Sequence, residues 1–420
     1  MAFKNKSLNI VNKKSKLLGA YIRLKREEEN MSIGFFSDIL NISKSYLSEI
    51  EHGKKIPNDY TLKQILKNLE IKYYCGEDIL SFLHDSVVMI YDKITLLRIE
   101  EAKNQIDEII EKEEYYLNSE GFLLYFLIKL INFVQNGCNS ERCHKLIKVL
   151  QEHLILLNRE ELAIFHDVVS AFYISEGMLE NARFHLEEGI EQASPSTNTY
   201  GMILYHSARL FQIDGNLIKS LNFCEKAKKE FTTLLNYKRI LYIEIFEANI
   251  YSMFFYFEEA EKKYLQVLEK AKMNNFNDVL LTVLDNLSWM KLRNGEYDEC
   301  LKLSQTSIDK GTIYDEVLLY APICYFKRND FNKCLESIKK VENEIQYPLK
   351  YLLDGIYYLC SDNGQKFIES LKKFLSNDVH LDKEMKCFVY EWMVEYYIDK
   401  NKLKEAIYIQ KHIIKTIKCM

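Results

Sequence analysis

Apolar residues recur at helical spacing along almost the whole chain, beginning with four short stretches near the N-terminus. In residues 17–24, 32–40, 44–51 and 61–71, apolar side chains stand three or four positions apart, which is the spacing of one face of an α-helix. The chain of 420 residues contains 4 Pro and 14 Gly, and these are the residues that interrupt helices most strongly. The pattern predicts an all-α protein.

The second and third of these stretches are separated by Asn41–Ser43, which is the length of a helix-turn-helix connection. Asn41 can adopt the left-handed conformation that is usually given to Gly, and Ser43 is a favoured N-cap for the following helix. In that helix Leu47 and Ile50 would be buried. The opposite side of residues 44–51 would then face a groove of DNA.

Charge separates the N-terminal part from the rest of the chain. Residues 1–72 hold 14 Lys or Arg against 8 Asp or Glu, a net charge of +6, whereas the remainder holds 42 against 53, a net charge of −11. A basic surface favours contact with the phosphates of DNA, and a helical bundle with a solvated basic face is the alternative. We therefore expect a DNA-binding head at residues 1–72 and a body with other partners at residues 73–420.

The head resembles the Xre or Cro/C1-type helix-turn-helix family, and the resemblance implies binding to a double-stranded DNA operator. It rests on Arg23, Arg26, Ser32, Phe36, Leu40, Ile42, Ser43, Leu47, Ser48, Ile50, Glu51, Gly53 and Pro57. Two positions depart from the family: Ile33 replaces a Gln that usually touches the DNA backbone, and Ser37 replaces an Ala. The candidate DNA-contacting residues are Arg23, Arg26, Ser43, Lys44, Ser45, Tyr46, Ser48, His52, Lys54 and Lys55.

The body contains an internal repeat of 34 to 41 residues, marked by a small residue in a similar setting. The series is Ala182, Ser220, Ala260, Cys300, Cys334 and Ala406, with fainter members at Ala102, Cys143 and Ile368. A small residue allows the second helix of a helix pair to approach its neighbour closely. The cysteines of this series are therefore expected to act as small packing residues.

These units resemble tetratricopeptide repeats, and the resemblance implies a right-handed superhelical solenoid. Gly or Asn stands at the turn between the two helices of a repeat, at Gly177, Gly215, Gly295, Asn329 and Asn401. A solenoid of this kind presents its first helices along a concave surface that suits an extended peptide. The body is therefore expected to bind a short peptide.

The inward positions of the first helices supply the candidate peptide-binding residues, because Asn can pair with peptide groups and Tyr and Trp add flat apolar area. They are Asn132, Asp167, Tyr205, Arg209, Tyr242, Asn249, Asp285, Asn286, Trp289 and Arg293. For each of them, the alternative is an ordinary exposed or interface residue.

Catalytic and membrane signals are missing from the sequence. The motifs of nucleotide-binding loops, zinc proteases and serine hydrolases do not occur, so we expect no enzyme and no cofactor. The group Cys138, Cys143 and His144 lacks the second ligand pair of a zinc site. The apolar run 122–134 is too short to span a bilayer, and we expect a cytoplasmic protein without membrane contact.

A basic Xre-type head joined to a tetratricopeptide-like body resembles the RRNPP group of bacterial regulators. The resemblance implies a quorum-sensing type of transcriptional regulator that is controlled by a short signalling peptide and is usually a homodimer. The later repeats, including the apolar stretch 387–398, CFVYEWMVEYYI, are the expected dimer surface, since a solenoid end needs a cap or a partner. The alternative from another class is a tetratricopeptide scaffold or response-regulator phosphatase-like protein that acts through protein–protein contacts.

Overall fold

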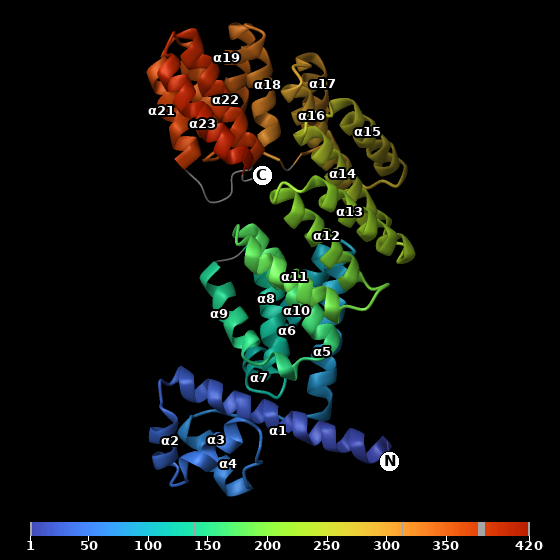
Figure 1. The fold of residues 1–420 in the computed structure, drawn as a ribbon, viewed down its shortest axis with the longest axis vertical. Helices are drawn as coiled ribbons and strands as arrows, with labels where there is room; N and C mark the ends of the chain where they lie inside the picture. The colour runs from blue at the N-terminus through green and yellow to red at the C-terminus, as the bar shows by residue number, and fades with distance from the viewer. Residues whose placement is uncertain (1, 138–139, 313, 377–382, 419–420) are drawn as a thin grey trace. The chain divides into compact units, whose positions relative to one another are not determined.

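The computed structural model describes residues 2–137, 140–312, 314–376 and 383–418, and the described residues form 23 α-helices and one short 3-10 helix (Figure 1). Contacts divide the chain into two compact units, residues 1–207 and residues 208–420. Among the described residues, no helix is long and apolar enough to cross a membrane. The all-α prediction is confirmed.

The first unit begins with the head and continues into the first helix pairs of the body. The head is built from α1 (Ala2–Glu28), α2 (Ile33–Ile39), α3 (Lys44–Glu51) and α4 (Asp59–Asn68). The body of this unit comprises α5 (Glu77–Thr95), α6 (Ile99–Ile110), α7 (Glu113–Leu117), α8 (Phe122–Gln135), α9 (Ser140–Gln151), η1 (Leu154–Leu156), α10 (Arg159–Ser175) and α11 (Leu179–Gln192). The boundary between the units falls within α12 (Asn198–Ile213).

The second unit begins with the end of α12 and with α13 (Leu217–Thr233) and continues as five helix pairs, seen as yellow-green to red ribbons in Figure 1. The pairs are α14 (Tyr237–Met253) with α15 (Phe257–Met273), α16 (Asn277–Arg293) with α17 (Tyr297–Asp309), α18 (Glu316–Lys327) with α19 (Phe331–Val341), α20 (Lys350–Cys360) with α21 (Gly364–Ser376), and α22 (Lys383–Asp399) with α23 (Leu403–Lys418).

A small apolar core holds the helices of the head together. Its fully buried side chains include Phe36, Leu47 and Ile50, one from α2 and two from α3. Helix α1 crosses α3 at Gly19, where a Cβ atom would lie 2.3 Å from the carbonyl oxygen of Ile50. A larger residue at position 19 would push α3 away from α1, so Gly is required here.

The head packs against the first repeat of the body within the same unit. Tyr21 of α1 is fully buried, and its hydroxyl donates a 2.7 Å hydrogen bond to Oδ1 of Asn118. The Tyr21 ring also contacts Tyr73 and Phe122, with ring centres 5.0 and 5.6 Å away. The contact division at Ser207 therefore does not coincide with the proposed boundary between residues 72 and 73, which stays a prediction.

The small residues of the repeat lie where two helices approach each other. Cys143, Ala182, Ser220, Ala260, Cys300 and Cys334 are fully buried, and Ala102, Ala406 and Ile368 are buried to at least 92%. Two of the polar members bond to the preceding helix: Ser220 Oγ donates to the Ala208 carbonyl at 2.8 Å, and Cys334 Sγ donates to the Pro322 carbonyl at 3.3 Å. The packing role predicted for the cysteines of this series is confirmed.

Helix α22 packs inside the second unit, which corrects the interpretation of its apolar stretch as a dimer surface. Phe388 contacts Trp289 of α16, and Trp392 contacts Phe326 of α18, at ring-centre distances of 5.3 and 5.6 Å. Val389 is fully buried in the same core. The apolar face of α22 is therefore covered by helices of its own chain, because α16 and α18 present aromatic side chains to it.

Candidate DNA-binding surface and ligand cavity

Helices α2 and α3 begin and turn as the sequence predicts. Ser32 and Ser43 have extended backbone conformations, and each side-chain oxygen accepts a 3.1 Å hydrogen bond, from the backbone N–H of Phe35 and of Tyr46. Asn41 has a φ of 53°, which is the left-handed conformation expected of it. These local features fix where α3 starts and which face it exposes.

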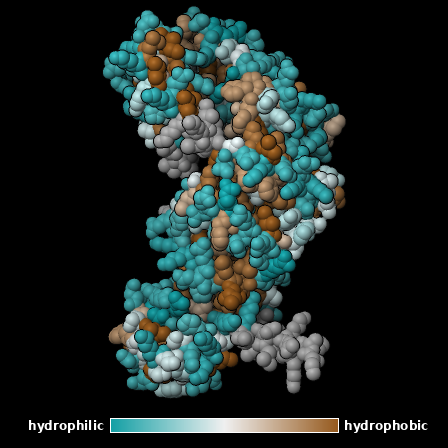
Figure 2. Space-filling view, in the orientation of Figure 1, coloured by the Kyte–Doolittle hydropathy of each residue, from teal (hydrophilic) through white to brown (hydrophobic). Residues whose placement is uncertain are grey.

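The outer face of α3 and the turn after it are accessible. Lys44, Ser45, His52, Lys54 and Lys55 are exposed, and Tyr46 and Ser48 are half-buried. Ser43 is exposed as well, although its hydroxyl serves as the cap. The face of the head visible in Figure 2 is largely hydrophilic. These positions can therefore meet a nucleic acid.

Lys55 takes part in a weak ion pair at the surface of the head. Lys55 Nζ lies 2.8 Å from the Glu49 carboxylate and 5.5 Å from the centre of the Tyr46 ring. Both members of the ion pair are exposed, and such pairs contribute little stability. A DNA phosphate could therefore replace Glu49 as the partner of Lys55.

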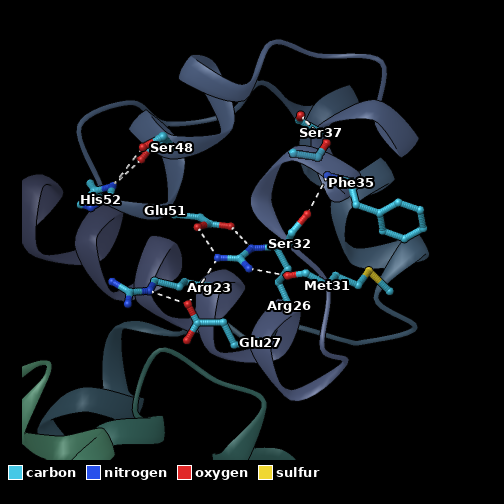
Figure 3. A network of polar contacts seen from close by, with 11 residues as sticks. Arg23, Arg26, Glu27, Met31, Ser32, Phe35, Ser37, Ser48, Glu51 and His52 are labelled. Atoms are coloured by element: carbon cyan, nitrogen blue, oxygen red, sulfur yellow. Dashed lines mark hydrogen bonds and ion pairs between the residues drawn. The ribbon is translucent and has the colours of Figure 1, made fainter.

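The two arginines of α1 have different environments, seen in Figure 3. Arg26 is buried, and its Nε and Nη2 donate to the two Glu51 carboxylate oxygens at 2.6 and 2.9 Å, while Nη1 donates to the Met31 carbonyl at 2.6 Å. The structure corrects the assignment of Arg26 as a DNA contact, because its guanidinium is enclosed and already paired. Arg23 is 40% exposed and pairs with Glu27 at 2.9 Å, so its role in DNA binding stays a prediction.

In the first unit, the candidate peptide-binding residues are partly occupied by internal bonds. Asp167 is 2% exposed and accepts hydrogen bonds from the Tyr91 hydroxyl and, at 2.8 Å, from Nδ1 of His206. The structure corrects the assignment of Asp167 as a peptide contact, because both carboxylate oxygens are used inside the fold. Asn132 and Tyr205 are half-buried, and Asn132 Oδ1 accepts a bond from Asn136.

In the second unit, several candidates are bonded across neighbouring helices. The Tyr264 hydroxyl donates to Oδ1 of Asn249 at 2.6 Å, and the Tyr242 hydroxyl donates to the Asp278 carboxylate at 3.0 Å. Asn286 donates to the Thr282 carbonyl of its own helix at 2.8 Å. The candidates Tyr242, Asn249 and Asn286 are half-buried. Each side chain of Asn249 and Asn286 thus commits one amide atom to the fold, and peptide clamping by them stays a prediction.

Three candidates form a stripe on α16, spaced four residues apart. Asp285 accepts a 2.9 Å hydrogen bond from the Tyr320 hydroxyl, and burial raises the pKa of Asp285 to about 7. The Trp289 ring lies between Tyr320 and Phe388, with ring centres 6.1 and 5.3 Å away. Arg293 follows at the end of the helix and is 10% exposed. The helical spacing used to select these residues does bring them to one surface.

Arg293 lines a cavity of about 260 Å³ within the second unit. The cavity walls include Phe254, Phe255 and Phe257 from the α14–α15 turn, and Cys387 and Glu391 from α22. Arg209 is half-buried and is not part of this lining. The sequence does not show that α22 contributes, because α22 lies about a hundred residues beyond Arg293. The available signal for the cavity was the Phe–Phe pair at the α14–α15 turn, where the repeats on either side have Gly.

Among the described residues, no group of three or more His, Cys, Asp or Glu could hold a metal ion. Of the cysteine and histidine group weighed as a metal site, Cys143 is a buried packing residue and the ring of His144 lies against Phe172, with ring centres 5.1 Å apart. Cys138 lies outside the described residues.

A helix-turn-helix family model matches residues 22–73. Over 58 residues, 13% of this chain, the sequence is 40% identical to the ImmF control region 10 kDa protein of Bacillus phage phi105. That match spans 64% of the phage protein. The family model falls on the head, which contains the exposed face of α3.

Two solved structures show the fold of the body. The Rap protein complexed with Competence and Sporulation Factor is 13% identical, with a TM-score of 0.62 over 80% of this chain and 98% of that chain. NprR in complex with its cognate peptide NprX is 15% identical, with a TM-score of 0.58 over 81% of this chain and 99% of that chain. At such identities the likeness extends to the fold alone. The chain therefore consists of an N-terminal helix-turn-helix domain of the Xre type and a tetratricopeptide-like repeat body with the fold of the Rap and NprR proteins.

Proposed function

We propose that this protein is a cytoplasmic transcriptional regulator that binds operator DNA through its head and is controlled by a short signalling peptide bound to its body. The observation that carries the proposal is the capped helix α3, which exposes Lys44 and Ser45 beside the basic turn at Lys54 and Lys55. Its partner helix α2 and the turn at Asn41 complete a helix-turn-helix, in which the second helix reads the major groove.

The body supports the second half of the proposal. NprR, which shares its fold, is described in complex with a cognate peptide, and Rap in complex with Competence and Sporulation Factor. In this chain the α16 stripe of Asp285, Trp289 and Arg293 ends at an aromatic cavity, which Arg293 lines. Polar groups on an apolar, aromatic surface are what a short peptide needs, since its backbone must be paired and its side chains buried.

We further propose that the protein acts as a homodimer. One helix-turn-helix reads a half-site, and two are needed for useful affinity and specificity. Because α22 is packed inside the second unit, its apolar face is not offered as the interface. Light scattering of the full chain with a selected operator should give the mass of two chains per duplex. One chain per duplex at saturating protein would sink the dimer and leave DNA binding intact.

The DNA-binding test uses the full chain and a duplex selected from a random library, with affinity measured by fluorescence anisotropy at several salt concentrations. Reversing both Lys54 and Lys55 to Glu should weaken binding to the selected and to random duplexes alike. The slope of log affinity against log salt should become shallower by up to roughly 3.6 for a dimer, since four phosphate contacts, two per head, each contribute roughly 0.9.

The matched control reverses two exposed lysines of the body, Lys145 and Lys302, whose side chains are each 74% exposed. This variant has the same change in net charge and should keep most of the affinity. If the wild type binds no duplex even at low salt, the head is not a DNA-binding domain. The alternative function, a protein-binding scaffold, is then favoured. An effect of the Lys54 and Lys55 change on one operator base would contradict their assignment to phosphates.

Peptide control is tested by passing culture supernatant from the native host over the immobilised protein and identifying the retained peptides by mass spectrometry. A synthetic copy of a retained peptide should change the anisotropy-measured affinity for the selected duplex. Affinity that stays the same at peptide concentrations saturating the body would contradict peptide control, while leaving DNA binding in place.

A further inference from the structure

Arg293 carries a positive charge that the fold leaves partly unpaired. Its side chain is 10% exposed, and Nη2 lies 3.4 Å from the Glu391 carboxylate, which is a long ion pair. Nη1 is buried and has no hydrogen-bond partner among the described residues. A guanidinium stays charged at any physiological pH, and a buried N–H without a partner is costly. In native proteins the large majority of buried donors have a hydrogen-bond partner.

The guanidinium is held in place by aromatic rings. Its central carbon lies 6.0 Å from the ring centre of Phe255 and 5.9 Å from those of Trp289 and Phe388. These distances fall within the range of cation–π attraction. The rings therefore fix the orientation of Arg293 without using its hydrogen-bond donors, of which Nη2 is engaged by Glu391 and Nη1 has no partner among the described residues.

The cavity beside Arg293 has the size and walls of a subsite for one or two residues. Its volume of about 260 Å³ is below the roughly 300–1,000 Å³ of sites for drug-sized ligands. Phe254, Phe257 and Met253 make most of one wall apolar. A ligand group that fits must combine an apolar body with an acceptor that reaches Nη1.

The turn that carries the aromatic wall is strained. Phe255 has a φ of 63°, in the left-handed region, and its side chain is 65% exposed. At the equivalent turn, the repeats on either side have Gly215 and Gly295, which adopt this conformation without strain. A bulky residue in such a conformation is an outlier that often marks a functional site. Here the exposed ring lies at the cavity and contacts the guanidinium.

We propose that the Arg293 cavity anchors the C-terminal residue of a short peptide, with an apolar side chain between the phenylalanine rings and the terminal carboxylate on Arg293 Nη1. The inference rests on the proposed peptide control and names the chemistry of one end of that peptide. A carboxylate is favoured over a neutral carbonyl because a charged acceptor makes the stronger bond to a guanidinium. Glu391, which is 41% exposed, can turn toward solvent when the carboxylate enters.

The probe is N-acetyl-leucine, which has the apolar side chain and the carboxylate, compared with N-acetyl-leucine amide. The chain has 2 Trp, and a Trp392→Phe background leaves Trp289 as the fluorescent reporter beside Arg293. N-acetyl-leucine should change the Trp289 emission with a millimolar dissociation constant, and the amide should bind about tenfold more weakly. Equal binding of acid and amide would overturn the proposal. Equal competition by inorganic phosphate would also overturn it, because the site would then recognise any anion.

Substitutions at Arg293 test whether the effect belongs to this side chain. Arg293→Gln should lose the preference for acid over amide, whereas Arg293→Lys should keep part of it. Arg328→Gln is the matched control, since Arg328 is an exposed arginine of the same unit, 43% exposed and paired with Asp298. A preference that survives in Arg293→Gln, with a melting curve like that of the control, would place the carboxylate elsewhere.

The two proposals fail in different ways. If the free-acid form of the regulatory peptide and its amide act equally on DNA binding, in wild type and in Arg293→Gln, the anchor is wrong and peptide control stands. If the probe binds as expected at Arg293 while no peptide changes DNA binding, the anchor stands as a carboxylate site and peptide control is wrong.

Discussion

Asp285 has a carboxyl group whose protonated form is favoured in the folded protein. Burial raises its pKa to about 7, although the Tyr320 hydroxyl donates to it and partly offsets the effect of burial. In the unfolded chain an Asp titrates near 3.9. The folded protein therefore binds this proton more tightly than the unfolded chain, and stability from the group is present below pH 4 and is lost as the pH rises through 7.

Replacing Asp285 with Asn should make the protein more stable at neutral and alkaline pH. Asn keeps an oxygen that accepts from Tyr320 and has no proton to lose. The difference in unfolding free energy between Asp285→Asn and wild type should be small near pH 4 and grow to at most about 4 kcal/mol above pH 7. Urea unfolding at pH 4.5, 6 and 8 measures it. A difference that does not vary with pH would mean that Asp285 is ionised at neutral pH in the fold.

At the residue scale, the sequence indicates local features well and pairings poorly. Ser43 as a cap and Asn41 as a left-handed residue follow from their own neighbours in the chain, so both could be predicted. Asp167 was placed on the right helix, but its bond to Tyr91 joins residues 76 positions apart. The prediction that Arg26 contacts DNA is wrong for the same reason, since its partner Glu51 lies 25 positions away. Helical periodicity gives the face of a residue and not the side chain that meets it.

At the scale of elements, the helix pairs could be predicted from the sequence, whereas the packing of α22 could not. The small residues of the repeats and the Gly or Asn at the turns let the sequence predict each helix pair, because these contacts repeat along the chain. The packing of α22 against α16 and α18 does not repeat in that way. No periodicity in the sequence could therefore show that α22 contributes to the Arg293 cavity.

Replacing Phe255 with Asn should stabilise the second unit while weakening the cavity. Asn is a frequent residue in the left-handed region, so the strain of the Phe, about 1 kcal/mol, would be relieved. The ring that is lost is 65% exposed and contributes little burial. The melting temperature should rise by about 2 to 4 °C, and N-acetyl-leucine should bind more weakly. A lower melting temperature would show that the ring is needed for packing.

At the scale of the whole molecule, the two compact units should respond to acid differently. In the first unit His166 and His185 lie with their Nδ1 atoms 3.0 Å apart, and burial lowers the pKa of each to about 4. An unfolded His titrates near 6.5. The stability from this pair is therefore present above pH 6.5 and is lost as the pH falls toward 4, which is the opposite of the dependence at Asp285.

Hydrogen exchange followed by mass spectrometry should separate the two responses. Between pH 7 and pH 5, after correction for the intrinsic exchange rate, protection should fall in residues 159–192 and hold or rise in residues 277–327. His185→Gln, which cannot be protonated, should reduce the loss in the first region. An equal loss of protection in both regions would contradict the opposite signs. The expected effect of one such histidine at pH 5 is about 2 kcal/mol.

Cys75 lies in the segment between α4 and α5, and among the cysteines that the structure describes it alone is exposed. Its thiol is thus a ready attachment point for a spin label at the junction of head and body, once Cys138 and Cys419 are replaced by Ser. Pulsed electron paramagnetic resonance would then measure the distance between the labels of two chains bound to one operator. Because Tyr21 bonds to Asn118 and fixes the head to the first repeat, that separation would follow the motion of the repeats, and peptide addition would be read as a change in a single distance.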